Sequence, residues 1–551
     1  MNTYQNQPWL RLYRPGAPAD LTPEAPDALV MWRRSVQRGG AAPFVHYFNR
    51  SYTAAEIDSR SDALAVALTE RGLRQGDRVA LFLQNVPQFV VALLAAWKAG
   101  CIAVPVNPML KERELGYLLA DSGAKGLICL QELWNATAAK AAEAAAVPVA
   151  VTTSPLDELS PPLPSVLRSV QRVETPGAED FGHLIRRYAG QRPGPVTLSP
   201  DTVALLTYTS GTTGDPKGAM NTHGNVVFNA QSYRDWSSLS ADDVCLAAAP
   251  LFHITGIIGH IAVAMLTGMP MVLGYRFDAG TMSELAERYG ATFTVMAITA
   301  YSALMNEPSA REHDLSCLTK AYSCGAPVPV SLVERFEREA GPYIHNIYGL
   351  TETTAPTHSV PYGQRAPVDP ASGALSIGVP MPGTLARIID EHGNDVPIGE
   401  PGEIAVRGPG VVPGYWGRPA ATAEAMPGGE LRTGDVGFMD AHGWFYLVDR
   451  KKDLINASGY KVWPREVEDV LMTHPAVREA VVVGVPDTYR GETVKAYVSL
   501  LPHTTAPSAE LIEFCKARLA SYKYPRLIEI MDELPKTATG KLLRRELRAR
   551  G

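Results

Sequence analysis

One Gly- and hydroxyl-rich segment carries the strongest chemical signal in this sequence. TYTSGTTGDPKG (207–218) follows an apolar run typical of a buried strand, and it ends with Lys217 and Gly218. Glycines let the backbone approach phosphate oxygens, and hydroxyls and free N–H groups can bind those oxygens. Lys217 adds a compact positive charge on a flexible stem. The segment lacks the GK[ST] of a Walker A loop, so it predicts a phosphate-binding loop of another kind, with an ordinary polar loop as the alternative.

Four further motifs follow this loop along the chain. They are YGLTET (348–353), RTGDVG (432–437), VDRKKDLINASGYKVWPREVE (448–468) and PKTATGKLLRREL (535–547). Together with 207–218, this ordered set resembles the adenylate-forming superfamily, which includes acyl-CoA synthetases, peptide-synthetase adenylation domains and luciferases. The resemblance extends from VPVNP (104–108) to Lys541. It implies a large N-terminal domain, a small mobile C-terminal domain and an active site at their junction.

The resemblance implies a reaction in two steps. A carboxylate attacks the α-phosphate of ATP, which gives acyl-AMP and pyrophosphate. A thiol, usually that of coenzyme A, then attacks the acyl carbon and expels AMP. A free carboxylate is a poor acyl donor because oxide is a poor leaving group, and adenylation supplies a stable one.

Several residues match positions that bind the nucleotide in this superfamily. The resemblance implies that the loop holds the triphosphate, that Tyr348 and a Gly-Ala-Pro turn enclose the adenine, that Thr351 binds the α-phosphate, and that Asp435 and Arg450 contact the ribose. Glu352 would hold Mg²⁺, a hard cation that suits oxygen ligands and phosphate. The full cofactor-binding set is Thr209, Ser210, Gly211, Thr212, Thr213, Lys217, Gly325, Ala326, Pro327, Tyr348, Gly349, Thr351, Asp435, Arg450, Gly459 and Lys541, with Glu352 as the metal ligand.

Lys541 resembles a C-terminal lysine that bridges the carboxylate and the α-phosphate during adenylation. A cation between two anions offsets their repulsion, and holding both reactants aligned removes much of the entropic cost of their encounter. The expected catalytic residues are Lys541, Thr351, Glu352, Lys217 and His253. Four of the site residues also have simpler interpretations: Glu352 as a carboxylate at a helix start, Asp435 as a turn residue, Arg450 as a surface charge and Lys541 as one cation of a basic terminal helix.

The resemblance also implies a rotation of the C-terminal domain between the two steps. Lys541 must leave before a thiol can reach the acyl carbon, and by position Lys452 is the hinge candidate. The ASGYK turn (457–461) would then approach the site, where Gly459 leaves room for the pantetheine arm. The alternative is a tight hairpin that needs Gly459 for its dihedral angles.

The expected acyl pocket lies in PLFHITGIIGHIAVAMLTGMP (250–270) and in segments 298–305 and 323–326. The pocket residues implied there are His253, Thr255, Gly256, Gly259, Tyr301 and Ala303. No Arg or Lys occurs between 251 and 275, so we expect an apolar acid. A medium- or long-chain fatty acid is the first expectation and an aryl or cyclic acid the second. His253 is a candidate gate, and a packed core histidine is the alternative.

Apolar runs alternate with helical periods from about Tyr52 to Gly349, which predicts an α/β fold with parallel sheets covered by helices. The expected strands are 78–83, 126–130, 203–209, 244–250, 269–274, 292–297 and 320–325, and the expected helices 87–98, 280–289 and 331–340. Residues 383–449 have the turns of a β-rich region, followed by a small α+β domain with a helix at 509–520. We place the domain boundary within 449–453, which gives domains 1–449 and 450–551.

Composition excludes some classes of function. The 551 residues are 46% hydrophobic and carry a net charge of −6, which argues against disorder and against general nucleic-acid binding. The N-terminus lacks a signal-peptide pattern, no segment predicts a membrane span, and the six separated cysteines are typical of reduced thiols in the cytoplasm. The expected activity is therefore an AMP-forming acid–thiol ligase that uses ATP, Mg²⁺ and coenzyme A. An amine or a carrier-protein thiol as acceptor, a non-catalytic binding protein on the same fold, and assembly as a homodimer stay open.

Overall fold

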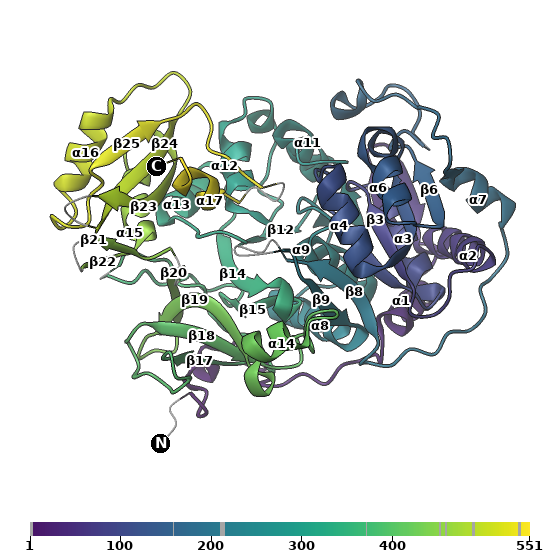
Figure 1. Cartoon of the computed structure of the whole chain (residues 1–551), viewed down its shortest axis with the longest axis horizontal. Coiled ribbons are helices and arrows are strands. Elements are labelled where there is room, and N and C mark those ends of the chain that lie inside the picture. The colour runs from purple at the N-terminus through teal and green to yellow at the C-terminus, as the bar shows by residue number, and fades with distance from the viewer. Residues whose placement is uncertain are drawn as a thin grey trace.

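A computed structural model of the chain describes residues 4–157, 159–209, 215–370, 372–450, 453–457, 460–487, 491–537 and 541–550, with the backbone alone at 449, 450, 456, 460, 461 and 491. The chain folds into a large part, which extends to residue 450, and a small part, which begins at residue 455. Figure 1 shows the small part, in yellow-green and yellow, against one end of the large part.

The first sheet of the large part has seven strands in the order β7-β6-β5-β3-β4-β8-β9. Its neighbours pair in parallel except for β8 and β9, which form an antiparallel pair. The strands are β3 (Arg78–Phe82), β4 (Ile102–Pro105), β5 (Ala124–Leu130), β6 (Val149–Thr153), β7 (Glu179–Asp180), β8 (Val203–Tyr208) and β9 (Gly218–Thr222). The helices that connect or flank them are α2 (Ala54–Glu70), α3 (Pro87–Lys98), α4 (Glu112–Ser122), α5 (Gln131–Leu133), α6 (Ala139–Ala144) and α7 (Phe181–Arg187).

The second sheet has nine strands in the order β16-β15-β14-β13-β12-β10-β11-β1-β2. Its middle strands are parallel, and antiparallel strands close both ends. The strands are β1 (Pro43–Tyr47), β2 (Arg50–Thr53), β10 (Cys245–Leu246), β11 (Met271–Leu273), β12 (Phe293–Ala297), β13 (Lys320–Cys324), β14 (Ile344–Leu350), β15 (Ala355–Ser359) and β16 (Val379–Pro380). Its helices are α1 (Ala28–Gly39), α8 (His223–Ser237), α9 (Ile254–Gly256), the π-helical η4 (Ile257–Ala262), α10 (Val263–Thr267), α11 (Ala279–Tyr289), α12 (Ile298–Asn306) and α13 (Val330–Ala340).

Helix α8 lies between the two sheets, and this position matters for the site. It contacts β8 and β9 of the first sheet, and η4 and α10 of the segment that packs on the second. Its start is fixed by a capping box, in which Thr222 accepts from the Asn225 N–H and Asn225 accepts from the Thr222 N–H. Most of the helix is buried, including Tyr233 near its end.

A four-stranded antiparallel sheet completes the large part, in the order β17-β18-β19-β20. Its strands are β17 (Leu385–Ile389), β18 (Gly402–Arg407), β19 (Leu431–Met439) and β20 (Phe445–Arg450), with the short helix α14 (Pro419–Ala425) beside them. This confirms the β-rich region expected from the sequence. Further short helical turns of the large part are η1 (Pro8–Leu12), η2 (Trp134–Ala138), η3 (Ser165–Leu167), η5 (Ala310–Glu312), η6 (Thr351–Thr353) and η7 (Pro427–Gly429).

The small part is an α+β unit built on a five-stranded sheet. Its elements are β21 (Ile455–Ala457), β22 (Tyr460–Val462), α15 (Pro464–Met472), β23 (Val477–Asp487), β24 (Gly491–Leu500), α16 (Ser508–Lys516), β25 (Leu527–Ile530) and α17 (Arg544–Arg548). The fold class predicted from the sequence is therefore confirmed. None of the helices that the structure describes is long and apolar enough to span a bilayer.

Three predicted elements have wrong lengths. The strand expected at 244–250 is β10 alone, because the Ala248 N–H donates to the Leu246 carbonyl at 2.9 Å and turns the chain. The strand expected at 269–274 is reduced to the three residues of β11. The helix expected at 509–520 ends at Lys516, where the Arg518 and Leu519 N–H groups both donate to the Cys515 carbonyl.

Candidate active site

The phosphate-loop segment and the YGLTET segment lie next to each other, although 130 residues separate Asn221 from Thr351. The Thr209 N–H donates to the Lys217 carbonyl at 3.0 Å and closes the base of the loop. Strand β9 then leads to Asn221, whose side-chain amide donates to the Thr351 carbonyl at 3.0 Å and to Thr354 Oγ1 at 2.9 Å. The predicted triphosphate residues Ser210, Gly211, Thr212 and Thr213 lie outside the described residues.

Glu352 and Lys217 meet at a tyrosine that the sequence analysis missed. The Tyr415 hydroxyl donates to Glu352 Oε1 at 2.8 Å, and Lys217 Nζ lies 5.2 Å from the centre of the Tyr415 ring. Burial first, then the Glu352 charge, raises the pKa of Tyr415, so its proton stays available for this bond. The ring holds a cation over its face and a carboxylate at its edge. Tyr415 belongs to a Gly-Tyr-Trp run in a loop, where no periodic pattern singles it out.

Tyr348 and Asp435 are brought together from two different sheets. The Tyr348 hydroxyl, at the end of β14, donates to Asp435 Oδ2 on β19 at 2.8 Å. Asp435 is only 3% exposed, and Gly434 before it has a φ of +71°, which favours glycine. Arg450 lies opposite Asp435 in the β19–β20 ladder, beside a bulge in β20. The two residues expected at the ribose are therefore cross-strand neighbours.

The Gly325-Ala326-Pro327 turn follows β13, and Tyr348 lies near the end of β14. The register pairs Ser323 with Asn346, so Gly325 and Tyr348 each come two residues later along parallel neighbours. Gly325 has a φ of +81°, which explains the glycine. Gly349 is explained by packing instead, since a Cβ there would lie 1.9 Å from the Ala355 carbonyl oxygen.

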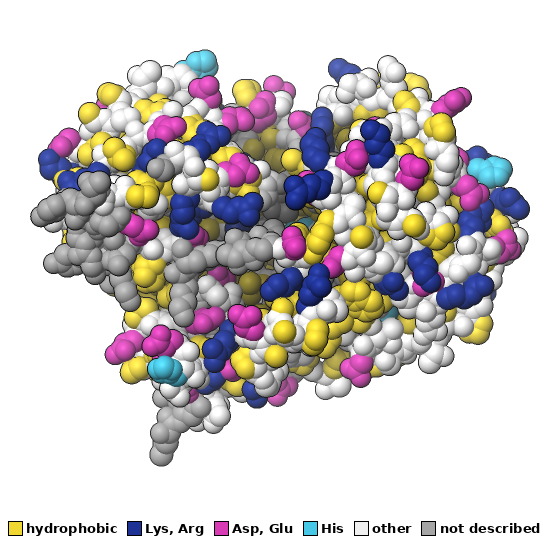
Figure 2. All heavy atoms as spheres, in the orientation of Figure 1, with side chains coloured by type: hydrophobic (Ala, Val, Ile, Leu, Met, Phe, Trp, Pro, Cys, Tyr) yellow, Lys and Arg dark blue, Asp and Glu magenta, His cyan; other side chains and the backbone are white. Residues whose placement is uncertain are grey.

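Lys541 of the small part lies near His253 of the large part. Burial, and to a smaller extent the Lys541 charge, lowers the pKa of His253 to about 4. The backbone of Lys541 is held by Thr537, whose N–H donates to the Lys541 carbonyl at 2.7 Å and whose Oγ1 accepts from the Lys541 N–H at 3.0 Å. Figure 2 shows Lys and Arg side chains on both sides of the hollow between the two parts.

The predicted acyl segment forms α9, η4 and α10. His253 caps α9: its Nδ1 accepts from the Thr255 N–H at 3.3 Å and lies 3.1 Å from Thr255 Oγ1. Cys324 Sγ is 3.8 Å from the same Oγ1. Gly256 is required by packing, because a Cβ there would lie 2.1 Å from the Pro250 carbonyl oxygen.

Two other residues expected in the acyl pocket, Tyr301 and Ala303, lie on α12 and not on the α9–α10 segment. The Tyr301 hydroxyl donates to the Tyr322 carbonyl at 2.9 Å, and its ring packs on Phe336, so it has a structural partner already. Ala303, also on α12, is half-buried. Lys452 and Gly459 lie outside the described residues, although β21 and β22 on either side of residues 458–459 form the expected hairpin.

Comparison with known proteins places the chain in a family. The model described as "AMP-binding enzyme" matches residues 32–416, and "AMP-binding enzyme C-terminal domain" matches 466–541. A long-chain-fatty-acid–CoA ligase of Escherichia coli O6:H1 is 38% identical over 98% of both chains. A feruloyl-CoA synthase of an Amycolatopsis species is 37% identical over 92% of this chain and 96% of its own length.

Among solved structures, the anthranilate CoA ligase AuaEII in complex with anthranoyl-AMP superimposes with a TM-score of 0.85 at 28% identity, covering 95% of this chain and 97% of that one. The two family models, the relatives that match over most of their length and the shared fold all indicate the same family. The chain therefore belongs to the AMP-binding enzyme family, and it is an AMP-forming acid–thiol ligase.

Proposed function

We propose that this ligase activates an apolar carboxylic acid, by preference a medium- or long-chain fatty acid, as acyl-AMP and then transfers the acyl group to coenzyme A. The contacts of Tyr415 carry the proposal, because they bring Lys217 of the phosphate loop and Glu352 of the YGLTET segment together. Lys541, whose charge influences the pKa of His253, would add a cation near the start of the acyl segment, where a bound carboxylate and the α-phosphate would meet. A cation at that point stabilises the charge that the two anions share in the transition state.

In this proposal, different residues bind the triphosphate, the adenine and the ribose of the nucleotide. Lys217, Thr209 and the loop between them would hold the triphosphate, and Thr351 the α-phosphate. Tyr348 and the Gly325 turn would enclose the adenine, while Asp435 and Arg450 would contact the ribose. Tyr348 also orients the Asp435 carboxylate through the bond between them.

Glu352 fits the proposed role toward Mg²⁺. Among the residues that the structure describes, no three His, Cys, Asp or Glu side chains converge as a metal-binding group. Mg²⁺ in nucleotide sites typically uses one or two carboxylates and takes its other ligands from phosphate and water. Glu352, held through one oxygen by Tyr415, meets that requirement. When bound, the ion neutralises charge on the triphosphate.

The second half-reaction needs the small part to rotate, and we propose residues 449–453 as the domain boundary with Lys452 as the hinge. Strand β20 ends at Arg450 and β21 begins at Ile455, so only a short connection joins the two parts. After rotation, the ASGYK segment (457–461) would approach the acyl carbon, with Gly459 giving the pantetheine arm room to pass.

The fatty-acid preference rests on the composition of the acyl segment. The side chains from Ile254 to Leu266 are buried and mostly aliphatic, and burial lowers the pKa of His260 to about 4, so this histidine is neutral. Burial of one methylene group contributes about 0.8 kcal/mol to binding, so a pocket lined by these aliphatic side chains would favour an acid with a long apolar tail. The relative named long-chain-fatty-acid–CoA ligase agrees with this choice. The relatives named feruloyl-CoA synthase and anthranilate CoA ligase favour the alternative, an aryl acid.

Pyrophosphate release tests the proposal across saturated acids of 6 to 18 carbons and a set of aryl acids, with and without coenzyme A. We expect release only with the right acid, rapid AMP release only with coenzyme A, and the highest kcat/KM among the longer saturated acids. A maximum among the aryl acids would select the alternative. If the acyl group is transferred to an amine or a carrier-protein thiol in preference to coenzyme A, the proposed acceptor is wrong. ATP binding without pyrophosphate release for any acid would indicate a binding protein.

A further inference from the structure

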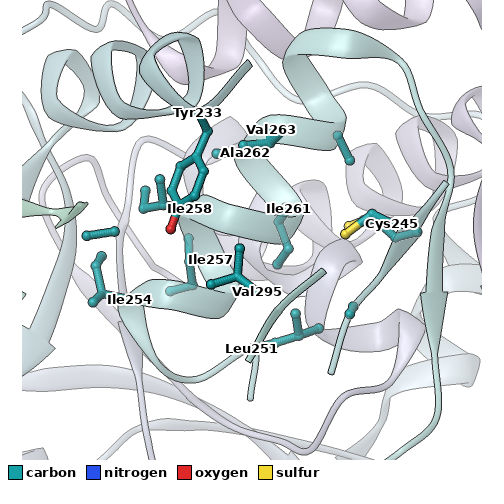
Figure 3. Packing of buried hydrophobic residues seen from close by; sticks show 14 of the residues in the cluster. Tyr233, Cys245, Leu251, Ile254, Ile257, Ile258, Ile261, Ala262, Val263 and Val295 are labelled. Carbon is teal, nitrogen blue, oxygen red and sulfur yellow. The ribbon is translucent and has the colours of Figure 1, made fainter. Parts of the chain in front are cut away.

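Tyr233 is a buried residue of the acyl region, and its hydroxyl has no hydrogen-bond partner in the described part of the chain. Tyr233 is 1% exposed, and its ring packs edge-on against Phe293 at 6.4 Å between ring centres. Figure 3 shows its hydroxyl pointing from α8 toward the η4 turn that carries Ile257 and Ile258. A buried hydroxyl normally bonds to protein, to water or to a ligand, because a buried polar group without a partner costs free energy.

A glycine lies beside this hydroxyl for no structural reason. Gly259 is inside η4 and has an ordinary negative φ, and a Cβ there would lie 3.4 Å from the Tyr233 oxygen and 3.5 Å from Val295 Cγ2, which are normal contacts. Gly256 differs, since its Cβ would overlap the Pro250 carbonyl oxygen. Glycine destabilises a helix relative to alanine. A single methyl group would therefore fit at 259 beside the Tyr233 hydroxyl, and the glycine leaves that volume free of side chain.

The surroundings of Tyr233 connect it to the proposed acyl site and are uncharged. Cys324 and Tyr322 are the titratable groups that influence it, and burial is the main cause of its raised pKa. Cys324 also influences Tyr301 and lies 3.8 Å from Thr255 Oγ1, which in turn lies beside His253. Ile257, Ile258 and Ile261 supply aliphatic side chains around it. Among the described residues, no Asp, Glu, Lys or Arg influences the pKa of Tyr233, so a charged ligand group would find no counter-ion there.

We propose that the Tyr233 hydroxyl binds an uncharged polar group carried by the tail of the acid, such as a hydroxyl, an ether or a carbonyl oxygen. This inference rests on the proposed function, because it assumes that the acid lies along α9 and η4. It narrows the substrate to an apolar acid with one hydrogen-bonding group away from the carboxylate. Recognition of this kind discriminates strongly, since the acid without the group leaves the tyrosine unpaired.

The test compares each parent acid with its monohydroxy forms: tetradecanoic acid with its positional hydroxy isomers, and cinnamic acid with the 2-, 3- and 4-hydroxy acids. For the best hydroxylated acid we expect kcat/KM for pyrophosphate release at least tenfold above that of its parent. Tyr233→Phe should abolish this preference and leave the parent acid within threefold of its original value. Gly259→Ala, which fills the space beside the hydroxyl, should also lower the preference.

Tyr47→Phe is the matched control, because Tyr47 is equally buried but its hydroxyl donates to the Pro155 carbonyl at 3.1 Å. We expect it to keep the preference. If the hydroxylated acids are no better than their parents, or if Tyr233→Phe retains the preference, the inference is wrong and a water molecule is the partner of Tyr233. In both cases the parent acids still release pyrophosphate, so the proposed function survives. If no acid of either series releases pyrophosphate, both proposals fail.

Discussion

Charge placement decides the chemistry at the scale of single residues. Lys541 is proposed for the adenylation step alone, because in the thioester step it would occupy the path of the thiol. We expect Lys541→Ala to lower acid-dependent pyrophosphate release by at least 100-fold while supplied acyl-AMP is still converted to acyl-CoA. The measurement is the rate of each half-reaction in the same preparation.

Lys536→Ala is the control for this variant. Lys536 lies in the same terminal segment, and its Nζ pairs with Glu479 of the small part at 2.6 Å. It should retain adenylation within a few-fold. Adenylation by Lys541→Ala at the original rate would contradict the role assigned to Lys541.

His260 gives the protein a dependence of stability on pH. Its Nε2 accepts from the Ala249 N–H at 3.2 Å and its Nδ1 lies 3.3 Å from Cys245 Sγ, and burial lowers its pKa from 6.5 to about 4. The folded state therefore binds fewer protons than the unfolded state between pH 4 and 6.5. The stabilisation is complete above pH 6.5 and is lost as the pH falls toward 4.

From pH 7 to pH 5 this single histidine should cost about 1–2 kcal/mol of unfolding free energy. His260→Gln removes the titrating group, so the melting temperature of the variant should fall less between pH 7 and pH 5 than that of the unchanged protein. An equal fall in both proteins would show that His260 does not contribute.

The sequence predicts some of these residues and not others. Lys217, Glu352 and Asp435 stand in ordered motifs, so the order and spacing of those motifs are enough to predict them as site residues. Tyr415 and Tyr233 stand alone in a loop and a helix, and only the packing of distant segments shows what their hydroxyls contact. The bond between Tyr348 and Asp435, 87 residues apart, likewise depends on how two sheets meet.

At the scale of elements, close backbone packing positions the site. Gly349 lets β14 approach β15 beside Tyr348 and Thr351, the residues proposed to bind the nucleotide. Gly349→Ala should lower the unfolding free energy by about 2–4 kcal/mol and reduce ATP binding, because its Cβ overlaps backbone that cannot move aside. Thermal unfolding and the KM for ATP measure the two effects.

Gly116→Ala provides the opposite control in α4. A Cβ at Gly116 meets nothing within 4 Å, and its φ is not in the left-handed region. It should raise stability by about 0.5–1 kcal/mol and leave the KM for ATP unchanged. A stable Gly349→Ala protein with normal ATP binding would show that the β14–β15 contact does not position the site.

Element types are predictable where a run of apolar residues is long, as for α3, whose twelve residues are all buried. The ends of strands are not predictable, because β10 ends at a local turn that the alanines after it, 247–249, do not indicate. The division of the parallel strands into two sheets is also beyond the sequence, since the order of strands depends on contacts between distant segments.

At the scale of the whole molecule, Arg465 joins the two parts. It lies on α15 of the small part, is 3% exposed, and donates from Nη1 to the Leu447 carbonyl of β20 at 2.9 Å. A rotation about Lys452 would break this bond. We expect Arg465→Met to slow adenylation about tenfold or more and to leave the conversion of supplied acyl-AMP unchanged or faster.

Arg518→Met is the control, since Arg518 is an exposed arginine of the same small part that covers the ring of Phe514. It should leave the ratio of the two half-reaction rates unchanged. Equal slowing of both half-reactions by Arg465→Met would mean that Arg465 stabilises the fold without favouring one orientation.

The cross-strand pair of Asp435 and Arg450 has a mechanical consequence. Arg450 stands two positions before the proposed pivot, on the rung of the ladder that faces the proposed ribose contact. With these proposed roles, nucleotide binding and rotation about the hinge would act on the same few peptide groups. An insertion of one residue in β20 would displace both the proposed ribose contact at Arg450 and the proposed hinge at Lys452. We therefore expect changes in the length of this strand to be tolerated only where nucleotide binding and domain rotation are both preserved.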